Sequence, residues 1–217
     1  MNEYLKWNEQ IITDFSDINV SDLYAHGFLF GRVEKGQMYE TRSVRVNLNK
    51  FDLSSENRRV LRKIENIQME KVLIPYSGYT WEIAKLGKDF YETKFGKGTF
   101  SANKIKELMT DAQKSNFNKI LLYTNNGTPT GYAICFENDE LIHYCYPFYD
   151  LKSNAMNLGI GMMTRAIVQA KENNKQYIYL GSASTPAALY KTQFNGFEWW
   201  DGKMWNIDVE ELKNILK

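Results

Sequence analysis

The sequence predicts a mixed α+β fold in which helices flank a mostly antiparallel sheet. Three apolar runs between 119 and 148 have the composition of strands, and short polar turns separate them. The first turn contains Asn126-Gly127, a pair that is typical of two-residue hairpins. An amphipathic helix over 154–173 and a buried strand over 176–180 follow. The order of a strand meander, a helix and a further strand therefore predicts a layered domain, to which we assign residues 76–217.

The residues before this domain predict a smaller region, 1–75, built from a hairpin and a helix. Two strand-like runs, 26–33 and 37–46, flank the turn formers 34–36. A capping signal at Ser55 precedes a helix whose apolar positions fall on one face and whose opposite face is basic. The remaining expected elements are a strand over 72–76, helices over 81–95, 103–114 and 186–193, an aromatic strand over 197–207 and a short terminal helix.

Composition excludes several classes of protein. Hydrophobic residues make up 43% and charged residues 24% of the 217 residues, which is ordinary for a globular protein and excludes disorder and coiled coils. No apolar run approaches the ~18 residues of a membrane helix, and the first ten residues lack a signal segment. Two cysteines and two histidines provide neither a disulfide framework nor a metal site. We therefore expect a cytoplasmic protein that binds neither membrane nor metal.

The sharpest local signal is the turn Asn157-Leu158-Gly159-Ile160-Gly161-Met162 at the start of the long helix. Glycines let backbone amides turn toward a ligand, and a helix amino terminus carries partial positive charge, so such a turn can bind a phosphate or a carbonyl oxygen. We predict that Asn157, Gly159, Gly161 and Met162 hold the acyl donor. The alternative is that the glycines only relieve crowding at the helix start. The spacing is similar to the pyrophosphate loop of the Gcn5-related N-acetyltransferases (GNAT).

A second, extended signal lies nearer the carboxyl terminus. There the sequence resembles the carboxy-terminal domain of the arginyl- and leucyl-tRNA–protein transferases, which add an amino acid to protein amino termini. The residues that carry this resemblance are Tyr179, Leu180, Gly181, Tyr190, Lys191, Phe194, Glu198 and Trp205. The amino-terminal region contributes Gly27-Phe28, Tyr39, Arg42, Arg45, Phe51, Ser55 and Arg58-Arg59. The resemblance spans roughly 23–66 and 120–207.

The chain departs from this family in two places. The amino-terminal cysteines that hold a metal cluster in some members are absent, because Cys135 is the first cysteine. After Gly181, residues 182–188 replace a Tyr-Trp-Ile stretch, and Gly196 stands where proline is usual. Since that stretch would border the acyl pocket, the donated amino acid and the acceptor specificity stay open.

The resemblance implies a GNAT-like acyltransferase fold and a specific reaction. An amino acid would pass from a charged tRNA to the α-amine of an acceptor protein that begins with Asp or Glu, which marks that protein for degradation through the N-end rule. Aminoacyl-tRNA would be the co-substrate, and no other cofactor is expected. By this resemblance Tyr190 is the candidate proton donor and Lys191 orients the ester or holds a phosphate. A buried aromatic ring and an ordinary surface lysine are the structural alternatives.

Gly181 and Ser182 join the predicted donor site, and a basic segment supplies the predicted tRNA or acceptor site. Cations outnumber acids between 42 and 63, so phosphates could bind there, although a solvated helix face has the same composition. We assign Tyr39, Arg42, Arg45, Arg58 and Arg59 to this site, with Arg42 or Arg45 also able to read an acidic acceptor residue. A second basic cluster, Lys94, Lys97, Lys104 and Lys106, could extend it.

Two other functions fit the same predicted fold. One is an acetyl-CoA-dependent N-acetyltransferase, in which the glycine turn holds pyrophosphate. The other is a non-catalytic module that binds peptide amino termini or RNA ends. We favour aminoacyl transfer because the resemblance includes the segment from Tyr39 to Arg59, which a plain acetyltransferase would not explain.

Overall fold

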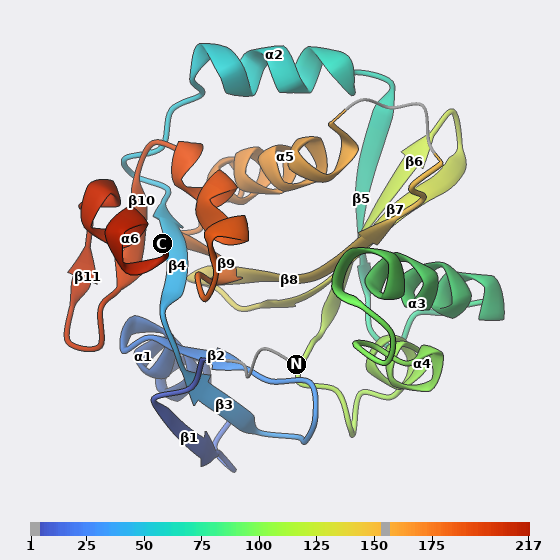
Figure 1. The fold of residues 1–217 in the computed structure, drawn as a ribbon. Helices are drawn as coiled ribbons and strands as arrows, with labels where there is room; N and C mark the ends of the chain where they lie inside the picture. The colour runs from blue at the N-terminus through green and yellow to red at the C-terminus, as the bar shows by residue number, and fades with distance from the viewer. Residues whose placement is uncertain (1–4, 153–156) are drawn as a thin grey trace. The chain divides into compact units, whose positions relative to one another are not determined.

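A computed structural model describes residues 5–152 and 157–217 of the chain. These residues fold into two compact units, and each unit is assembled from segments that are distant in sequence. The described residues of Met1–Ser54, Asn138–His143 and Ile167–Lys217 form unit 1, and those of Ser55–Glu137 and Tyr144–Ala166 form unit 2. The boundary expected at residue 75 lies inside unit 2. Figure 1 traces the elements along the chain.

Unit 1 begins with a three-stranded antiparallel sheet in the order β1-β3-β2. Its strands are β1 (Asn8–Ile11), β2 (Phe28–Phe30) and β3 (Gln37–Glu40), and helix α1 (Asp17–Ala25) connects the first two. The hydroxyl of Ser16 caps α1 by accepting a hydrogen bond from the amide of Asn19. The pairing of β2 with β3 confirms the predicted hairpin. Neither β1 nor α1 was expected from the sequence.

The predicted strand over 37–46 is wrong as a single element. Its second half is β4 (Ser43–Asn47), which leaves the first sheet and lies between β9 (Tyr177–Ser182) and β10 (Phe197–Trp200). Both neighbours run antiparallel to β4. Residues 141–143 of β8 (Leu141–Tyr149) pair in parallel with β9. The expected strand over 197–207 is likewise divided, because β10 and β11 (Trp205–Asn206) form a hairpin. The 3₁₀ helix η1 (Pro186–Gln193) and α6 (Val209–Ile215) complete unit 1.

The ladder between β4 and β9 contains a bulge. Ser43 pairs with Ser182, but Arg45 pairs with Tyr179, so two residues of β9 face one residue of β4. Gly181 is one of the two bulged residues and has φ +84°, a conformation that glycine adopts without strain. The bulge therefore changes the direction of the backbone at the end of β9, where the resemblance places part of the acyl-donor site.

Unit 2 is built on the meander that the sequence predicts. Strands β5 (Ile67–Leu73), β6 (Lys119–Asn125) and β7 (Thr128–Glu137) pair antiparallel, and the strand order continues to β8. Asn126 and Gly127 both have positive φ, which confirms the predicted hairpin turn. The helices are α2 (Ser55–Lys63), α3 (Trp81–Phe95) and α4 (Ala102–Thr110), and α3 packs beside α4 (Figure 1). Helix α5 (Leu158–Glu172) starts in unit 2 and ends in unit 1, and residues 154–156 of its predicted span lie outside the described residues.

Candidate active site

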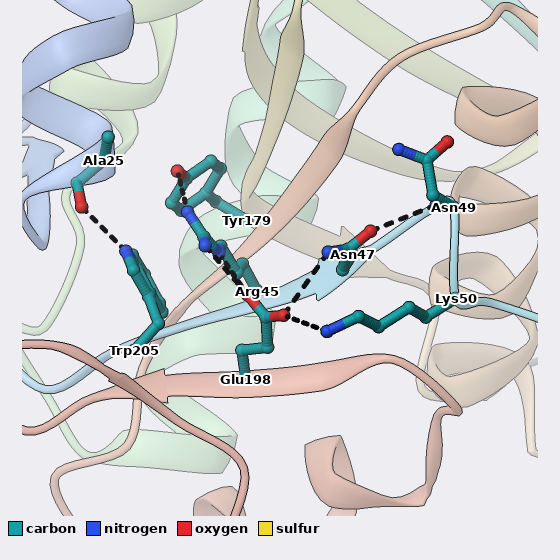
Figure 2. A network of polar contacts seen from close by, with 8 residues as sticks. All are labelled: Ala25, Arg45, Asn47, Asn49, Lys50, Tyr179, Glu198 and Trp205. Atoms are coloured by element: carbon teal, nitrogen blue, oxygen red, sulfur yellow. Dashed lines mark hydrogen bonds and ion pairs between the residues drawn. The ribbon is translucent and has the colours of Figure 1, made fainter.

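Four of the residues that carry the family resemblance meet in one buried network of unit 1 (Figure 2). The guanidinium of Arg45 on β4 donates from Nε to Oε2 of Glu198 on β10 at 2.8 Å, and its Nη2 lies 2.8 Å from the same oxygen. Its Nη1 donates to the hydroxyl of Tyr179 on β9 at 3.2 Å. The indole of Trp205 on β11 donates to the carbonyl oxygen of Ala25 at 2.7 Å. The network therefore joins four neighbouring strands, in the order β11-β10-β4-β9, to α1.

Aromatic rings enclose the same guanidinium. Its central carbon lies 3.9 Å from the ring centroid of Tyr177 and 3.8 Å from that of Trp205, which are distances of strong cation–π contact. Burial raises the pKa of Tyr179 to about 12, although the charge of Arg45 acts in the opposite direction. Arg45 is thus committed to the protein's own network. Its predicted role in binding tRNA or an acceptor stays a prediction.

The end of β9, just after the bulge, gathers two cationic side chains. Lys191 on η1 donates from Nζ to the carbonyl oxygen of Ser182 at 2.8 Å. Arg42 donates from Nη1 to the carbonyl oxygen of the next residue, Ala183, at 3.2 Å. Gly181 lies beside the lysine, because a Cβ on this residue would make an ordinary contact, at 3.7 Å, with Nζ of Lys191. The predicted site residues Arg42, Gly181, Ser182 and Lys191 therefore lie together.

Arg42 is poorly neutralised by its surroundings. Its Nε is buried without a hydrogen-bond partner among the described residues. Arg42 also forms no ion pair with a carboxylate in that part of the chain. Its guanidinium carbon lies 5.6 Å from the ring centroid of Trp7. Burial lowers the pKa of the Arg42 guanidinium, and the group nevertheless stays charged because its ordinary pKa is so high. A half-buried cation of this kind favours an anionic ligand.

The structure adds a residue that the sequence analysis missed. His143 on β8 is 1% exposed, and its Nδ1 lies 2.9 Å from the hydroxyl of Tyr24. Burial, together with the smaller effect of the positive charge of Lys191, lowers the pKa of His143 to about 3. The imidazole is therefore neutral at physiological pH and lies near the lysine. A single histidine within an otherwise apolar strand was the one sequence signal that could have pointed to it.

Tyr190 stands next to Lys191 on η1, with 48% of its surface exposed. The structural alternative considered for this residue, a buried aromatic ring, is therefore wrong. Its backbone carbonyl oxygen accepts a hydrogen bond from Nε2 of Gln193 at 2.6 Å, within the same 3₁₀ helix. The exposed phenol is accessible to a substrate, and its role as proton donor stays a prediction.

The glycine turn belongs to unit 2 and is closely packed. A Cβ on Gly159 would lie 2.7 Å from the hydroxyl of Tyr149, and one on Gly161 would lie 2.8 Å from Cδ1 of Ile64. Both glycines thus permit close approach of neighbouring side chains, as the structural alternative proposed. Asn157 has φ +66° and its carbonyl oxygen accepts the amide of Gly161 at 2.9 Å, which starts the helix. The amides of residues 158, 159 and 160 have no partner within the helix. Their use in binding the acyl donor stays a prediction.

The remaining predicted residues are divided between the units. Tyr39 on β3 belongs to unit 1, where its ring lies against Gly31 and 4.7 Å from Nζ of Lys6. Arg58 and Arg59 are exposed on α2 in unit 2, and Arg59 forms a bidentate pair with Glu56. The buried side chain of Met162 belongs to the core, while its carbonyl oxygen accepts the hydroxyl of Tyr123.

A mixed, mostly antiparallel sheet with flanking helices, one of which starts at a glycine turn, is the architecture of the GNAT-like acyltransferase fold. The chain belongs to the family described as arginine-tRNA-protein transferase, C terminus. The model of this family matches residues 92–201, which are 110 of the 217 residues. The matched segment contains the bulge, Tyr190 and Lys191. No curated protein matches the chain.

One solved structure that reaches a TM-score of 0.50 supports the fold, and two others are similar at lower scores. A GCN5-related glucosamine N-acetyltransferase region of a fungal multi-domain β-N-acetylglucosaminidase shares 10% identity at a TM-score of 0.50, covering 91% of this chain and 23% of that chain. L-PGS from Bacillus licheniformis shares 14% identity at a TM-score of 0.48, and the match covers 77% of this chain and 52% of L-PGS. FemX shares 11% identity at a TM-score of 0.47, and the match covers 80% of this chain and 61% of FemX. The chain thus spans about half the length of L-PGS. None of the helices in the described residues is both long and apolar enough to cross a bilayer.

Proposed function

We propose that this protein transfers an amino acid from a charged tRNA to the α-amine of an acceptor protein whose first residue is Asp or Glu. The observation that carries the proposal is the family match over 92–201, which covers the end of β9 and all of η1. The cations Arg42 and Lys191 gather at that point. A tRNA end and an acidic amino terminus are both anionic, so this cluster is suited to either substrate.

The reaction needs little activation because the aminoacyl ester is already reactive. The neutral α-amine attacks the ester carbonyl carbon and forms a tetrahedral intermediate, whose oxyanion needs hydrogen-bond donors. Backbone amides of the bulge at Leu180-Gly181 are the proposed donors. The bond to the ribose oxygen then breaks, the nitrogen loses a proton and the ribose oxygen gains one. We assign that second proton to the phenol of Tyr190 and the orientation of the ester to Lys191.

Arg42 is the proposed reader of the acceptor. Its unpartnered Nε and its position beside Ala183 leave donors for a carboxylate, and a guanidinium binds a carboxylate better than a neutral amide does. Asp and Glu at the acceptor amino terminus would therefore be preferred over Asn and Gln. His143 is held neutral and therefore adds no competing charge near Lys191.

The test is incorporation of radiolabelled amino acid from a pool of charged tRNAs into peptides that begin with Asp, Glu, Asn or Gln. We expect incorporation from at least one charged tRNA, with the acidic peptides favoured. A folded sample that transfers nothing from any charged tRNA would remove the proposal. In a parallel assay, acetyl-CoA at micromolar concentration should not raise the melting temperature; strong protection would favour N-acetyltransfer instead.

A further inference from the structure

Unit 2 contains an open pocket of about 630 Å³ that shares no lining residue with the cluster at the end of β9. The end of α2, the start of β5 and the turn between β6 and β7 form its walls, and the segment after β8 closes one side. A volume of this size accommodates an organic molecule rather than a single ion. The chemistry of the lining side chains then indicates which class of organic molecule could bind.

Part of the lining is apolar and rigid. Ile64 and Ile67 line the pocket and are 1% and 2% exposed. Ile64 is fixed from behind, because it packs against Gly161 of α5 and its carbonyl oxygen accepts a hydrogen bond from Nη2 of Arg165 at 3.2 Å. Both isoleucines are almost completely covered by the core, so they support the wall of the pocket and leave its accessible surface to polar side chains.

The polar part of the lining is rich in side-chain amides. Asn66, Asn125 and Asn126 line the pocket, with the hydroxyl of Thr128 beside them. Oδ1 of Asn125 is buried and has no hydrogen-bond partner among the described residues. An unsatisfied buried acceptor is costly, and a ligand donor group that reaches this oxygen would recover that cost. Amides offer both donors and acceptors, as the edge of a nucleobase requires.

The charges at the pocket are mainly positive. Lys63 and Lys152 line it, and neither ammonium group has an ion-pair partner within residues 5–152 and 157–217. Asp150 also lines it, but one of its carboxylate oxygens already accepts the backbone amide of Lys152 at 2.8 Å. Arg58 and Arg62 are exposed on the adjoining helix α2. A phosphate group is therefore the anion that this arrangement suits best.

We propose that this pocket binds one nucleoside phosphate, with the base edge at the asparagine amides and the phosphate between Lys63 and Lys152. The ligand is either an unpaired nucleotide of an RNA chain or a free nucleotide. The proposed function names tRNA as the RNA, and the exposed arginines of α2 then continue the contact along its backbone. The site itself does not depend on transfer activity.

Binding of fluorescently labelled tRNA by the full chain, measured by polarisation at several salt concentrations, tests the proposal. The double variant Lys63→Ala/Lys152→Ala is compared with Lys203→Ala/Lys217→Ala, which removes equal charge from exposed lysines outside the pocket. We expect the pocket variant to bind roughly tenfold more weakly at physiological salt and to show a salt slope shallower by about one to two. Equal affinity of the two variants would overturn the inference.

A second experiment tests whether a nucleobase contributes to binding and whether the ligand is a nucleotide of RNA or a free nucleotide. Binding of AMP and of ribose 5-phosphate, which carry the same phosphate, is measured by calorimetry. We expect AMP to bind more tightly, with the difference reduced in Asn66→Ala, and equal binding would refute a nucleoside site. Displacement of tRNA by AMP identifies an RNA nucleotide as the occupant, whereas AMP binding without displacement identifies a free nucleotide. If the binding results are as expected but no amino acid is transferred in the incorporation assay, the proposed function is refuted and the binding site is not.

Discussion

Arg45 and Glu198 face each other directly across β4 and β10, and two nitrogens of the arginine lie 2.8 Å from one carboxylate oxygen of the glutamate. The other carboxylate oxygen accepts longer hydrogen bonds from Asn47 and Lys50, each 3.4 Å in length (Figure 2). Both side chains are buried. Residues that are 153 positions apart in the chain therefore hold the centre of unit 1 together.

Substitution of one partner of the Arg45–Glu198 pair should lower the stability of the protein strongly, because it leaves the other partner buried without its counter-charge. Glu198→Leu leaves a buried guanidinium without its counter-charge, so the free energy of unfolding should fall by about 3–5 kcal/mol. Arg45→Leu/Glu198→Leu removes both charges and should lose less than the sum of the two single variants. Urea unfolding followed by circular dichroism measures this. The exposed pair of Arg59 with Glu56 is the control, and Glu56→Ala should change stability little. A fully additive double variant would contradict the prediction.

Arg42→Ala should reduce the preference for acidic acceptors. Loss of a charge-assisted hydrogen bond costs about 1.5–3 kcal/mol, which corresponds to a roughly 10- to 100-fold loss in kcat/KM for a peptide that begins with Asp. The peptide that begins with Asn should be affected much less. Arg42→Lys should restore part of the preference, because it keeps the charge but not the planar fork. Equal losses on both peptides would show that Arg42 does not read the acceptor.

Gly181→Ala should impair transfer more than it impairs folding. At φ +84° an L residue is strained, and its Cβ would contact Nζ of Lys191. Gly127→Ala is a matched control, because Gly127 has φ +79° and nothing within 4 Å of its Cβ position. Both variants should lose about 1 kcal/mol of stability. Only Gly181→Ala should also reduce transfer, measured with the peptide that begins with Asp.

Gly161→Ala separates the two explanations of the glycine turn. The added Cβ crowds Cδ1 of Ile64, so the variant should be destabilised, and the smaller side chain in Gly161→Ala/Ile64→Val should recover most of that loss. If the glycines serve packing alone, transfer should recover together with thermal stability in the double variant. Stability that returns without transfer would instead indicate that the turn holds the donor.

Acid should unfold the protein partly through His143. Its pKa is about 3 in the folded protein and ordinarily 6.5, so the unfolded chain takes up a proton at a pH where the folded protein does not. The stabilisation is fully present above pH 6.5 and is lost as the pH falls toward 3. The loss is up to about 1.4 kcal/mol per pH unit. His143→Gln should show a shallower dependence of unfolding free energy between pH 6 and pH 4. An unchanged slope would contradict this account.

The sequence predicted elements well wherever the signal was local. Helix α3 occupies the expected residues 81–95, and the meander over β6, β7 and β8 follows from its apolar runs and from the Asn126-Gly127 turn. The expected helix over 103–114 ends earlier, at Thr110. Nothing in the sequence indicated that β4 would separate from β3, because both belong to one strand-like run and only their distant partners differ.

The candidate site shows the same division. Lys191, Gly181 and Arg42 were identified from a family pattern, and the structure brings the two cations to the consecutive carbonyl oxygens of Ser182 and Ala183, just after Gly181. Arg45 was identified by the same pattern, but the structure gives it a buried ion pair. A pattern of letters contains no information on burial, so a basic residue that binds a ligand and one that holds strands together look alike in sequence.

By itself the sequence determined most of the helices, the two hairpins with clear turn signals, the family and the residue types available for chemistry, since propensity, turn geometry and local spacing depend on neighbouring residues. The tertiary structure alone decided that β4 lies between β9 and β10, that His143 is neutral beside Lys191, and that a pocket opens next to α2. These outcomes depend on contacts between distant segments, and the free energy of such contacts comes from burial and desolvation that arise only when the chain folds.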